Sequence, residues 1–145
     1  MARKVCFSFK YDDVARAMIV RNSWVTQDSA GFIDKADFEE VKRKGDAAIK
    51  KWIDEQLKGT TVTVVLVGEN TKKSKRVQYE IDESIKRGNG LLEINISKIN
   101  ALGKGTSGFC GWMLPDKYKG YAWVKNEGYK NLPSWIELAA KAANK

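Results

Sequence analysis

The clearest hydrophobic pattern in the chain is the run at residues 60–68, with the sequence TTVTVVLVG. Its apolar residues are nearly consecutive and mostly β-branched, which is typical of a strand buried on both faces of a sheet. Shorter apolar runs, bounded by turn-forming residues, predict further strands at residues 3–9, 31–34, 91–96 and 121–124. Residues 60–68 are therefore the predicted central strand of a sheet.

Elsewhere the apolar residues recur every three or four positions, and this spacing predicts helices. The predicted helices cover residues 12–24, 36–57 and 75–87, and a final helix begins at Pro133 or Ser134. Gly45 interrupts the second of these helices and predicts a break there. Residues 97–120 are rich in Gly and Lys and follow neither pattern, so they predict a long loop.

Strands and helices alternate along the first two thirds of the chain, and this order indicates a parallel sheet. We therefore predict an α/β fold, a flavodoxin-like three-layer sandwich with a mostly parallel central sheet and helices on both faces. No repeat and no linker-like segment divides the 145 residues, so we expect residues 1–145 to form a single domain.

The expected ligand site lies at one edge of this sheet. In an open parallel sheet, ligands bind beyond the carboxyl ends of the strands, where the strand order reverses. Residues 8–11 follow the first predicted strand, and Asp34 ends the second. The helix predicted at residues 75–87 begins at the same edge, so these segments are expected to meet there.

One carboxylate of the helix that follows the central strand stands apart from its solvent-facing acids. At 100° per residue, Glu80 falls at the margin of the apolar face defined by Val77, Ile81 and Ile85. A carboxylate held partly out of water in a cleft can have a raised pKa or can bind a ligand through strong hydrogen bonds. The alternative is a surface ion pair with Arg76, four residues earlier.

The composition limits the chemistry that is open to the chain. Histidine is missing, which excludes Ser-His and Cys-His catalysis. Cys6 and Cys110 lack metal-site spacing, so we expect no metal, and Cys6 lies in an apolar run typical of a core. The net charge of +8 favours anionic partners such as nucleotides, or else reflects a solvated lysine-rich surface. The basic residues are scattered, so we expect no specific binding of nucleic acid.

The first residues, MARKVCFSF, lead directly into a strand-like run and do not have the pattern of a signal peptide. No apolar run approaches the ~20 residues of a membrane-spanning helix. We therefore expect a cytoplasmic protein with no membrane association.

Six stretches of the sequence resemble the TIR-like proteins of the Thoeris antiphage defence system, the ThsB group. They are KVCFSFKYDDV, VRNSWVT, GFIDKADFEEVKRKGDAAIKKWID, TTVTVVLVG, RVQYEIDESIKRGNGLLEINI and WVKNEGYKNLPSWI. These stretches run in order over nearly the whole chain, which makes the resemblance specific. The resemblance implies a TIR-like fold.

The resemblance also implies an enzyme of the NAD glycohydrolase or ADP-ribosyl cyclase type, with NAD as substrate and no cofactor. Such enzymes cleave the nicotinamide glycosidic bond and release a cyclic or conjugated ADP-ribose second messenger, which activates an effector protein. The resemblance aligns Glu80 with the catalytic glutamate of the family, and a carboxylate can stabilise positive charge that develops on the ribose. A phage-derived activator and a second copy of the chain are further candidate partners.

The candidate substrate-binding residues around Glu80 are Ser8, Phe9, Lys10, Tyr11, Asp34 and Ser84. Phe9 and Tyr11 are candidates for stacking on nicotinamide or adenine, with packing at the rim as the alternative. Lys10 is suited to a pyrophosphate. Asp34 either contacts the ligand or caps a helix, and Ser84 either orients Glu80 or is a hydroxyl on the helix surface.

Two positions depart from the family pattern. The family usually has Trp where this chain has Arg76, and it commonly has His where this chain has Lys10. These two residues favour the alternative of a non-catalytic TIR-like signalling module that acts through protein–protein assembly. A nucleotide-binding sensor that uses the same crevice without chemistry is a further alternative.

Overall fold

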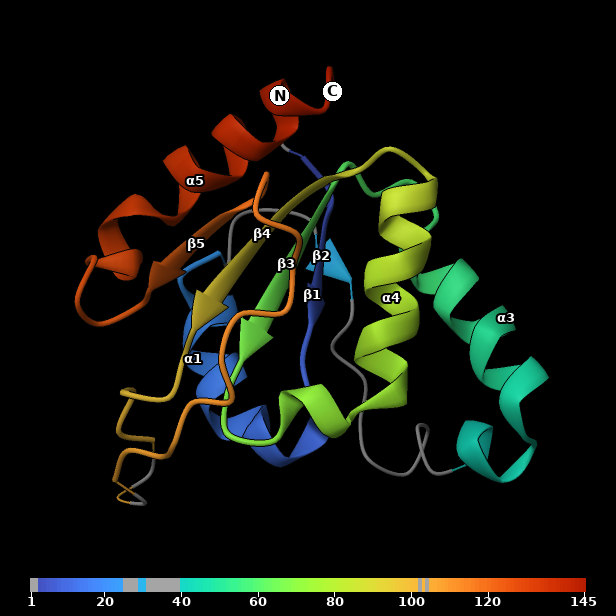
Figure 1. Ribbon diagram of the computed structural model, residues 1–145, viewed down its shortest axis with the longest axis horizontal. Helices are drawn as coiled ribbons and strands as arrows, with labels where there is room; N and C mark the ends of the chain where they lie inside the picture. Colours follow the sequence, from blue (N-terminus) through green and yellow to red (C-terminus); the bar gives the residue numbers. More distant parts are fainter. Residues whose placement is uncertain (1–2, 25–28, 31–39, 102, 104) are drawn as a thin grey trace.

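The computed structural model describes residues 3–24, 29–30, 40–101, 103 and 105–145 (Figure 1). Its strands are Val5–Ser8 (β1), Ser29–Ala30 (β2), Val62–Val67 (β3), Gly90–Asn95 (β4) and Lys119–Ala122 (β5). They form one sheet in the order β2-β1-β3-β4-β5, and each neighbouring pair is parallel. This is the flavodoxin-like order of a doubly wound α/β fold, so the predicted fold class is confirmed.

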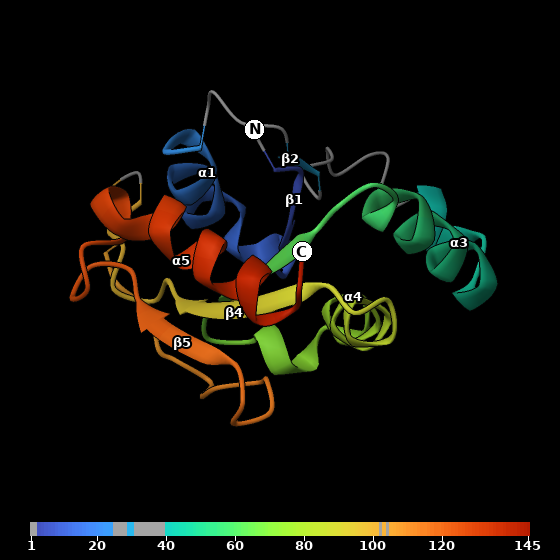
Figure 2. The same cartoon turned by 90° about the horizontal axis from the view of Figure 1, so that it is seen from above.

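Helices lie on both faces of this sheet, as the view from above shows (Figure 2). They are Val14–Asn22 (α1), Asp46–Leu57 (α3), Lys75–Lys86 (α4) and Gly128–Ala142 (α5). α1 and α5 pack on the face to which Phe7 and Val64 point. α3 and α4 cover the opposite face, to which Cys6 and Val65 point. Within the described parts of the chain, no helix is both long and apolar enough to cross a bilayer.

Two predicted strands differ from the described ones. The strand predicted at residues 31–34 lies outside the described residues, and the described strand in this part of the chain is β2. The strand predicted at residues 121–124 begins earlier, because the backbone of Lys119 already pairs with that of Leu92 in β4. Pairing with a neighbouring strand, rather than apolar character, therefore sets the bounds of β5.

The predicted start of the last helix is wrong. α5 begins at Gly128, and Pro133 lies inside it. A Cβ atom at position 128 would lie 2.1 Å from Cε3 of Trp123, so only glycine lets the first turn pack against this ring. Gly and Pro usually mark turns, and for this reason the segment NEGYKNLP resembles a turn in the sequence.

The predicted break in the second helix is confirmed. Gly45 has a φ of 94° and directly precedes α3, while the described residues 40–43 before it are also helical. This backbone conformation is open to glycine and costly for other residues. The glycine therefore ends one helix and allows the next to start in a new direction.

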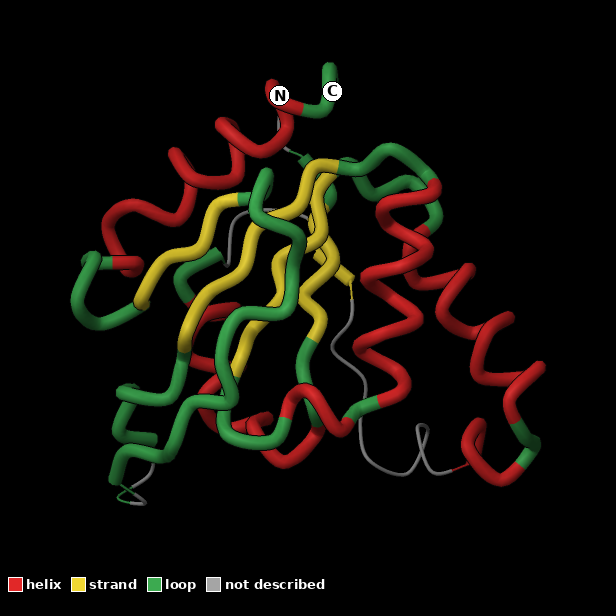
Figure 3. Tube along the Cα trace, in the orientation of Figure 1, coloured by secondary structure: helices red, strands yellow, loops and turns green. Residues whose placement is uncertain are grey.

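The connection from β4 to β5 forms neither helix nor strand in its described residues, as predicted (Figure 3). Glu93 of β4 holds part of it against the sheet. Its Oε1 accepts hydrogen bonds from the N–H groups of Met113 (2.6 Å) and Leu114 (3.2 Å). Burial raises the pKa of the Glu93 carboxyl, and the two N–H groups oppose this rise. A single buried carboxylate therefore anchors this loop.

Candidate active site

The candidate site lies where the strand order reverses, between β1 and β3. In folds of this type the carboxyl ends of these two strands border the ligand crevice. α4 begins at the same edge, where Ser74 Oγ accepts a hydrogen bond from the Val77 N–H (3.2 Å) and caps the helix. The predicted meeting of the end of β1 with the start of this helix is confirmed, whereas Asp34, predicted at the same edge, lies outside the described residues.

Glu80 lies deeper than its sequence position predicts. Its side chain is only 1% exposed, whereas Ile85, expected on the buried face, is 39% exposed. The buried face of α4 is formed by Arg76, Val77, Glu80, Ile81 and Ser84. α4 packs against both the sheet and α3. The contact with α3 extends the buried face of the helix to the side that carries Glu80. The carboxylate is therefore inside the protein, one helical turn below the edge of the sheet.

The two oxygens of the Glu80 carboxylate have different partners. Oε1 lies 3.4 Å from Nε of Arg76, and Oε2 accepts a hydrogen bond from the thiol of Cys6 (Sγ–Oε2 3.5 Å). Both members of the ion pair are buried, with side-chain exposures of 6% and 1%. The pairing of Arg76 with Glu80 is thus present, but its predicted location on the surface is wrong.

The protonation of Glu80 reflects these surroundings. Burial raises the pKa of the Glu80 carboxyl, because water no longer solvates its charged form. The positive charge of Arg76 opposes this rise, and the neighbouring polar side chains of Cys6 and Ser8 also lower the pKa. The site therefore contains an acid whose charge depends on its three neighbours.

Arg76 closes the site on the side of the crevice. Its Nη2 donates a hydrogen bond to the carbonyl oxygen of Phe9, directly after β1. Its Cζ lies 5.4 Å from the centre of the Phe9 ring and 5.7 Å from that of Trp52 in α3, within the range of cation–π contacts. The guanidinium thus joins β1, α3 and α4 around Glu80.

The predicted residues of the β1 edge differ in how they are placed. Ser8 is fully buried, and its Oγ has no hydrogen-bond partner among the described residues. Phe9 is also buried and lies against Arg76, so its ring packs inside the protein. Lys10 and Tyr11 are half-buried, and Nζ of Lys10 lies 2.5 Å from Oδ2 of Asp12. Of this group, only Lys10 and Tyr11 reach the surface of the rim.

The two remaining candidate residues are Ser84 and Asp34. Ser84 is fully buried, and its Oγ lies 2.7 Å from Oγ1 of Thr63 in a shared hydrogen bond. The alternative of a surface hydroxyl is therefore wrong, and Ser84 lies one turn farther from the rim than Glu80. Asp34 lies outside the described residues. Ligand contacts by either residue stay predictions.

Two residues of the site were not among the predicted site residues. Cys6 touches Glu80, and Trp52 touches Arg76. A signal for Cys6 was present, because residues two apart on a strand point to the same face and Ser8 is a predicted site residue. Trp52 had no such signal, since its place depends on how α3 packs against α4.

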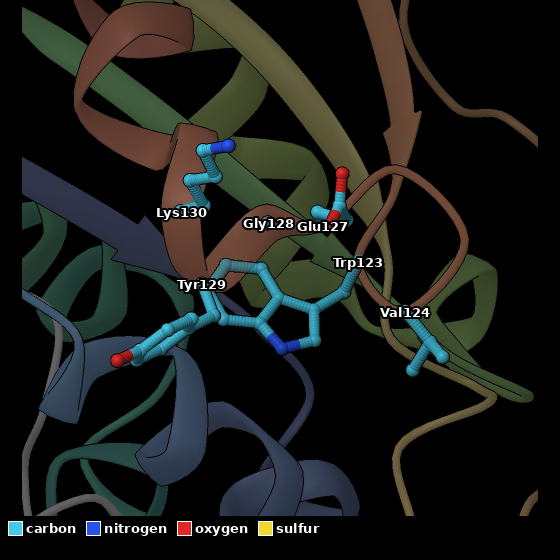
Figure 4. A pocket seen from close by; sticks show the side chains of 6 residues that line it. All are labelled: Trp123, Val124, Glu127, Gly128, Tyr129 and Lys130. Atoms are coloured by element: carbon cyan, nitrogen blue, oxygen red, sulfur yellow. The ribbon is translucent and has the colours of Figure 1, made fainter.

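Two sizeable cavities lie away from Glu80. The first, of 700 Å³, is at the start of α5 (Figure 4) and is lined by Trp123, Val124, Glu127, Gly128, Tyr129 and Lys130. The second, of 540 Å³, lies near the amino ends of β4 and β5 and the last turns of α5. Neither includes the buried carboxylate, which in this conformation is closed to solvent.

Comparisons with known proteins agree with this architecture. The family model described as "Thoeris protein ThsB, TIR-like domain" matches residues 6–101, which include β3, α4, β4 and all but the first residue of β1. A protein of Bacillus cereus (strain MSX-D12), named "Putative cyclic ADP-D-ribose synthase ThsB1", is 37% identical over 145 residues. The alignment covers 93% of this chain and 72% of that relative. The chain therefore belongs to the TIR-like ThsB family of the Thoeris antiphage defence system.

Proposed function

We propose that this protein cleaves the bond between nicotinamide and ribose in NAD and releases a cyclic or conjugated ADP-ribose product. The observation that carries the proposal is the Glu80 carboxylate, buried below the crevice between β1 and β3 and held by side chains on both oxygens. The name of the relative from Bacillus cereus supports a cyclic product. The proposal implies a cytoplasmic enzyme, because NAD is a metabolite of the cytoplasm.

The reaction suits a site with one carboxylate and no histidine. The C–N bond between ribose C1′ and nicotinamide breaks, and its electron pair moves to the nicotinamide nitrogen, which becomes neutral. Positive charge develops on the ribose, where Glu80 stabilises it, as carboxylates do in glycoside hydrolysis. A nucleophile then bonds to C1′. An atom of the same ADP-ribose gives a cyclic product, a second molecule gives a conjugate, and water, which loses a proton to the solvent, gives ADP-ribose.

Other residues of the crevice complete this proposal. Ser8 has a buried hydroxyl without a partner among the described residues, which makes it a candidate for binding the ribose. Lys10 is suited to the pyrophosphate once it leaves Asp12, and Tyr11 at the rim is suited to stacking on a base. Phe9 is a weaker candidate for stacking, since its ring is buried under Arg76. Ser84 remains a candidate contact, as does Asp34, which lies outside the described residues.

The closed state of the site favours a mechanism that requires activation. NAD can reach Glu80 only after Arg76 leaves the carboxylate, and separating the partners of a buried ion pair costs several kcal/mol. We therefore propose that a phage-derived factor, or assembly with a second copy of the chain, supplies this energy. The product then diffuses to an effector protein.

The proposal is tested by incubating the purified protein with NAD, with and without an extract of phage-infected cells. Mass spectrometry of the small molecules should show free nicotinamide and an ADP-ribose-derived product when the extract is present. An extract of uninfected cells is the control. If nicotinamide stays bound in NAD while a related ThsB protein releases it in the same assay, the proposal is wrong.

The buried ion pair supports a second candidate, a non-catalytic TIR-like signalling module. Arg76 neutralises the Glu80 carboxylate and blocks access to it from the crevice. A module that carries out no reaction can keep this ion pair closed permanently. For this candidate we expect self-assembly that does not depend on nucleotide, as measured by light scattering. A nucleotide-binding sensor instead predicts heat of binding with NAD in calorimetry and no release of nicotinamide.

A further inference from the structure

Cys6 lies against the Glu80 carboxylate, although its apolar run in the sequence predicts only a core residue. Cys6 lies in β1, between β2 and β3, and its side chain is fully buried. Its thiol contacts Oε2 of Glu80, while Oε1 faces Arg76 and makes no regular hydrogen bond among the described residues. The two oxygens of the carboxylate therefore differ in how firmly they are held.

We infer that Cys6 is a positioning residue, whose thiol fixes Oε2 of Glu80 and leaves Oε1 as the oxygen that meets the ribose. The inference rests on the function proposed above and adds which residue orients the carboxylate and which oxygen is free to act. It concerns the orientation of Glu80, since Cys6 itself is too deep to contact a substrate.

The thiol is suited to this role because it stays protonated. Burial raises the pKa of Cys6 well above its ordinary value, and the negative charge of Glu80 raises it further. The charges of Arg76 and Lys4 act in the opposite direction but do not cancel the rise. Cys6 is therefore a thiol with an S–H group to donate, and a carboxylate is a strong acceptor for it.

The two partners of Glu80 differ in their freedom to move. The backbone of Cys6 pairs with Ala30 on one side and with Thr63 on the other, so its position is fixed by the centre of the sheet. Arg76 has a long, flexible side chain and lies at the edge of the sheet, where it bonds to Phe9. An incoming ribose can therefore replace Arg76 at Oε1, whereas Cys6 keeps its place at Oε2.

The first test observes the hydrogen bond directly and needs no enzymatic activity. Cys110→Ala leaves Cys6 as the single thiol, and Raman spectroscopy of this variant then reports the S–H stretch of Cys6. We expect a hydrogen-bonded band that moves to higher frequency when Glu80→Gln is added. Glu83→Gln, on the same helix, is the control and should leave the band in place. A band that does not respond to Glu80→Gln would overturn the inference.

The second test compares Cys6→Ala and Cys6→Ser in the NAD assay. Among the described residues, Arg76, Cys6 and Ser8 are the groups that lower the pKa of Glu80 against its burial. Removing the donor with Cys6→Ala should lower kcat by about tenfold or more, since a misplaced catalytic group is costly. It should also move the acidic limb of the pH profile to higher pH. Cys6→Ser keeps a donor and should restore both.

The outcomes separate this inference from the proposed function. If the unsubstituted protein releases no nicotinamide under any activating condition, the proposed function fails, and the Raman result still decides whether Cys6 holds Glu80. If the protein is active, a wild-type pH profile in Cys6→Ala overturns the inference. Thermal unfolding of both variants identifies a loss of activity that comes from poorer packing alone. Such a loss lowers the midpoint of thermal unfolding but does not move the pH profile of activity.

Discussion

Glu80 and Arg76 show how a single contact sets the state of the site. The carboxylate and the guanidinium are both buried, and each is costly inside the protein without the other. Arg76 gains further support from the rings of Phe9 and Trp52. The pair therefore stabilises a closed site, and the same pair must separate for a substrate to bind.

Removing only the cation should destabilise the protein strongly. Arg76→Met leaves Glu80 buried without its counter-charge, and we expect the free energy of unfolding at pH 7 to fall by about 3–5 kcal/mol. Adding Glu80→Gln should recover most of this loss, because no unpaired charge remains. Urea denaturation measures both changes.

The control for this pair is Arg87→Met. Arg87 makes ion pairs with Asp54 and Glu83 at the surface, and these are worth less than about 1 kcal/mol. Equal losses for Arg87→Met and Arg76→Met would contradict the account of a buried, mutually dependent pair.

Among the elements, β3 and α4 could be predicted closely, whereas β5 and α5 could not. Consecutive β-branched residues define β3, and a regular apolar spacing with a Ser cap defines α4. The start of α5 depends on the contact of Gly128 with Trp123, and the depth of Glu80 depends on α3. Contacts between distant segments leave no local pattern in a sequence, so these features had to come from the structure.

The start of α5 gives a prediction of its own. Gly128→Ala places a methyl group against the Trp123 ring, and overpacking of this kind typically costs about 1–3 kcal/mol. We expect a lower midpoint of thermal unfolding, measured by circular dichroism. Gly88→Ala, where no atom lies within 4 Å, tests the cost of a positive φ alone and should lower the midpoint less. A larger effect at Gly88 would contradict the packing argument.

The loop between β4 and β5 gives a prediction about pH. Burial raises the pKa of Glu93 in the folded protein, so the folded state binds a proton more readily than the unfolded state. The contribution of Glu93 to stability is thus complete below the ordinary pKa of glutamate and is lost as the pH rises through the folded pKa. Relative to Glu93→Gln, the wild type should lose free energy of unfolding over this window. A difference that grows with pH would contradict the prediction.

In the molecule as a whole, the helices that pack on the parallel sheet differ in how many residues they bury. α3 and α4 have the same length, yet α3 buries only Ile53 and Leu57 while α4 buries five residues. α3 also carries Trp52, which lies against Arg76. Displacement of α3 would therefore break fewer buried contacts than displacement of α4, and it would remove the Trp52 ring from Arg76.

Hydrogen exchange measures this difference in stability. We expect the backbone amides of α3 to exchange faster than those of α4 and α5 in the resting protein, because fewer buried contacts oppose local opening. Mass spectrometry of peptic fragments resolves the three helices. Equal protection of α3 and α4 would contradict this difference.

The catalytic role proposed for the Glu80 carboxylate is decided by the rate of nicotinamide release in Glu80→Gln. With NAD and the activating extract, we expect this variant to lose turnover by about a hundredfold or more, since it keeps the shape of the side chain without its charge. Glu83→Gln, three residues along the same helix, should keep the wild-type rate. Full activity in a folded Glu80→Gln protein would contradict the account.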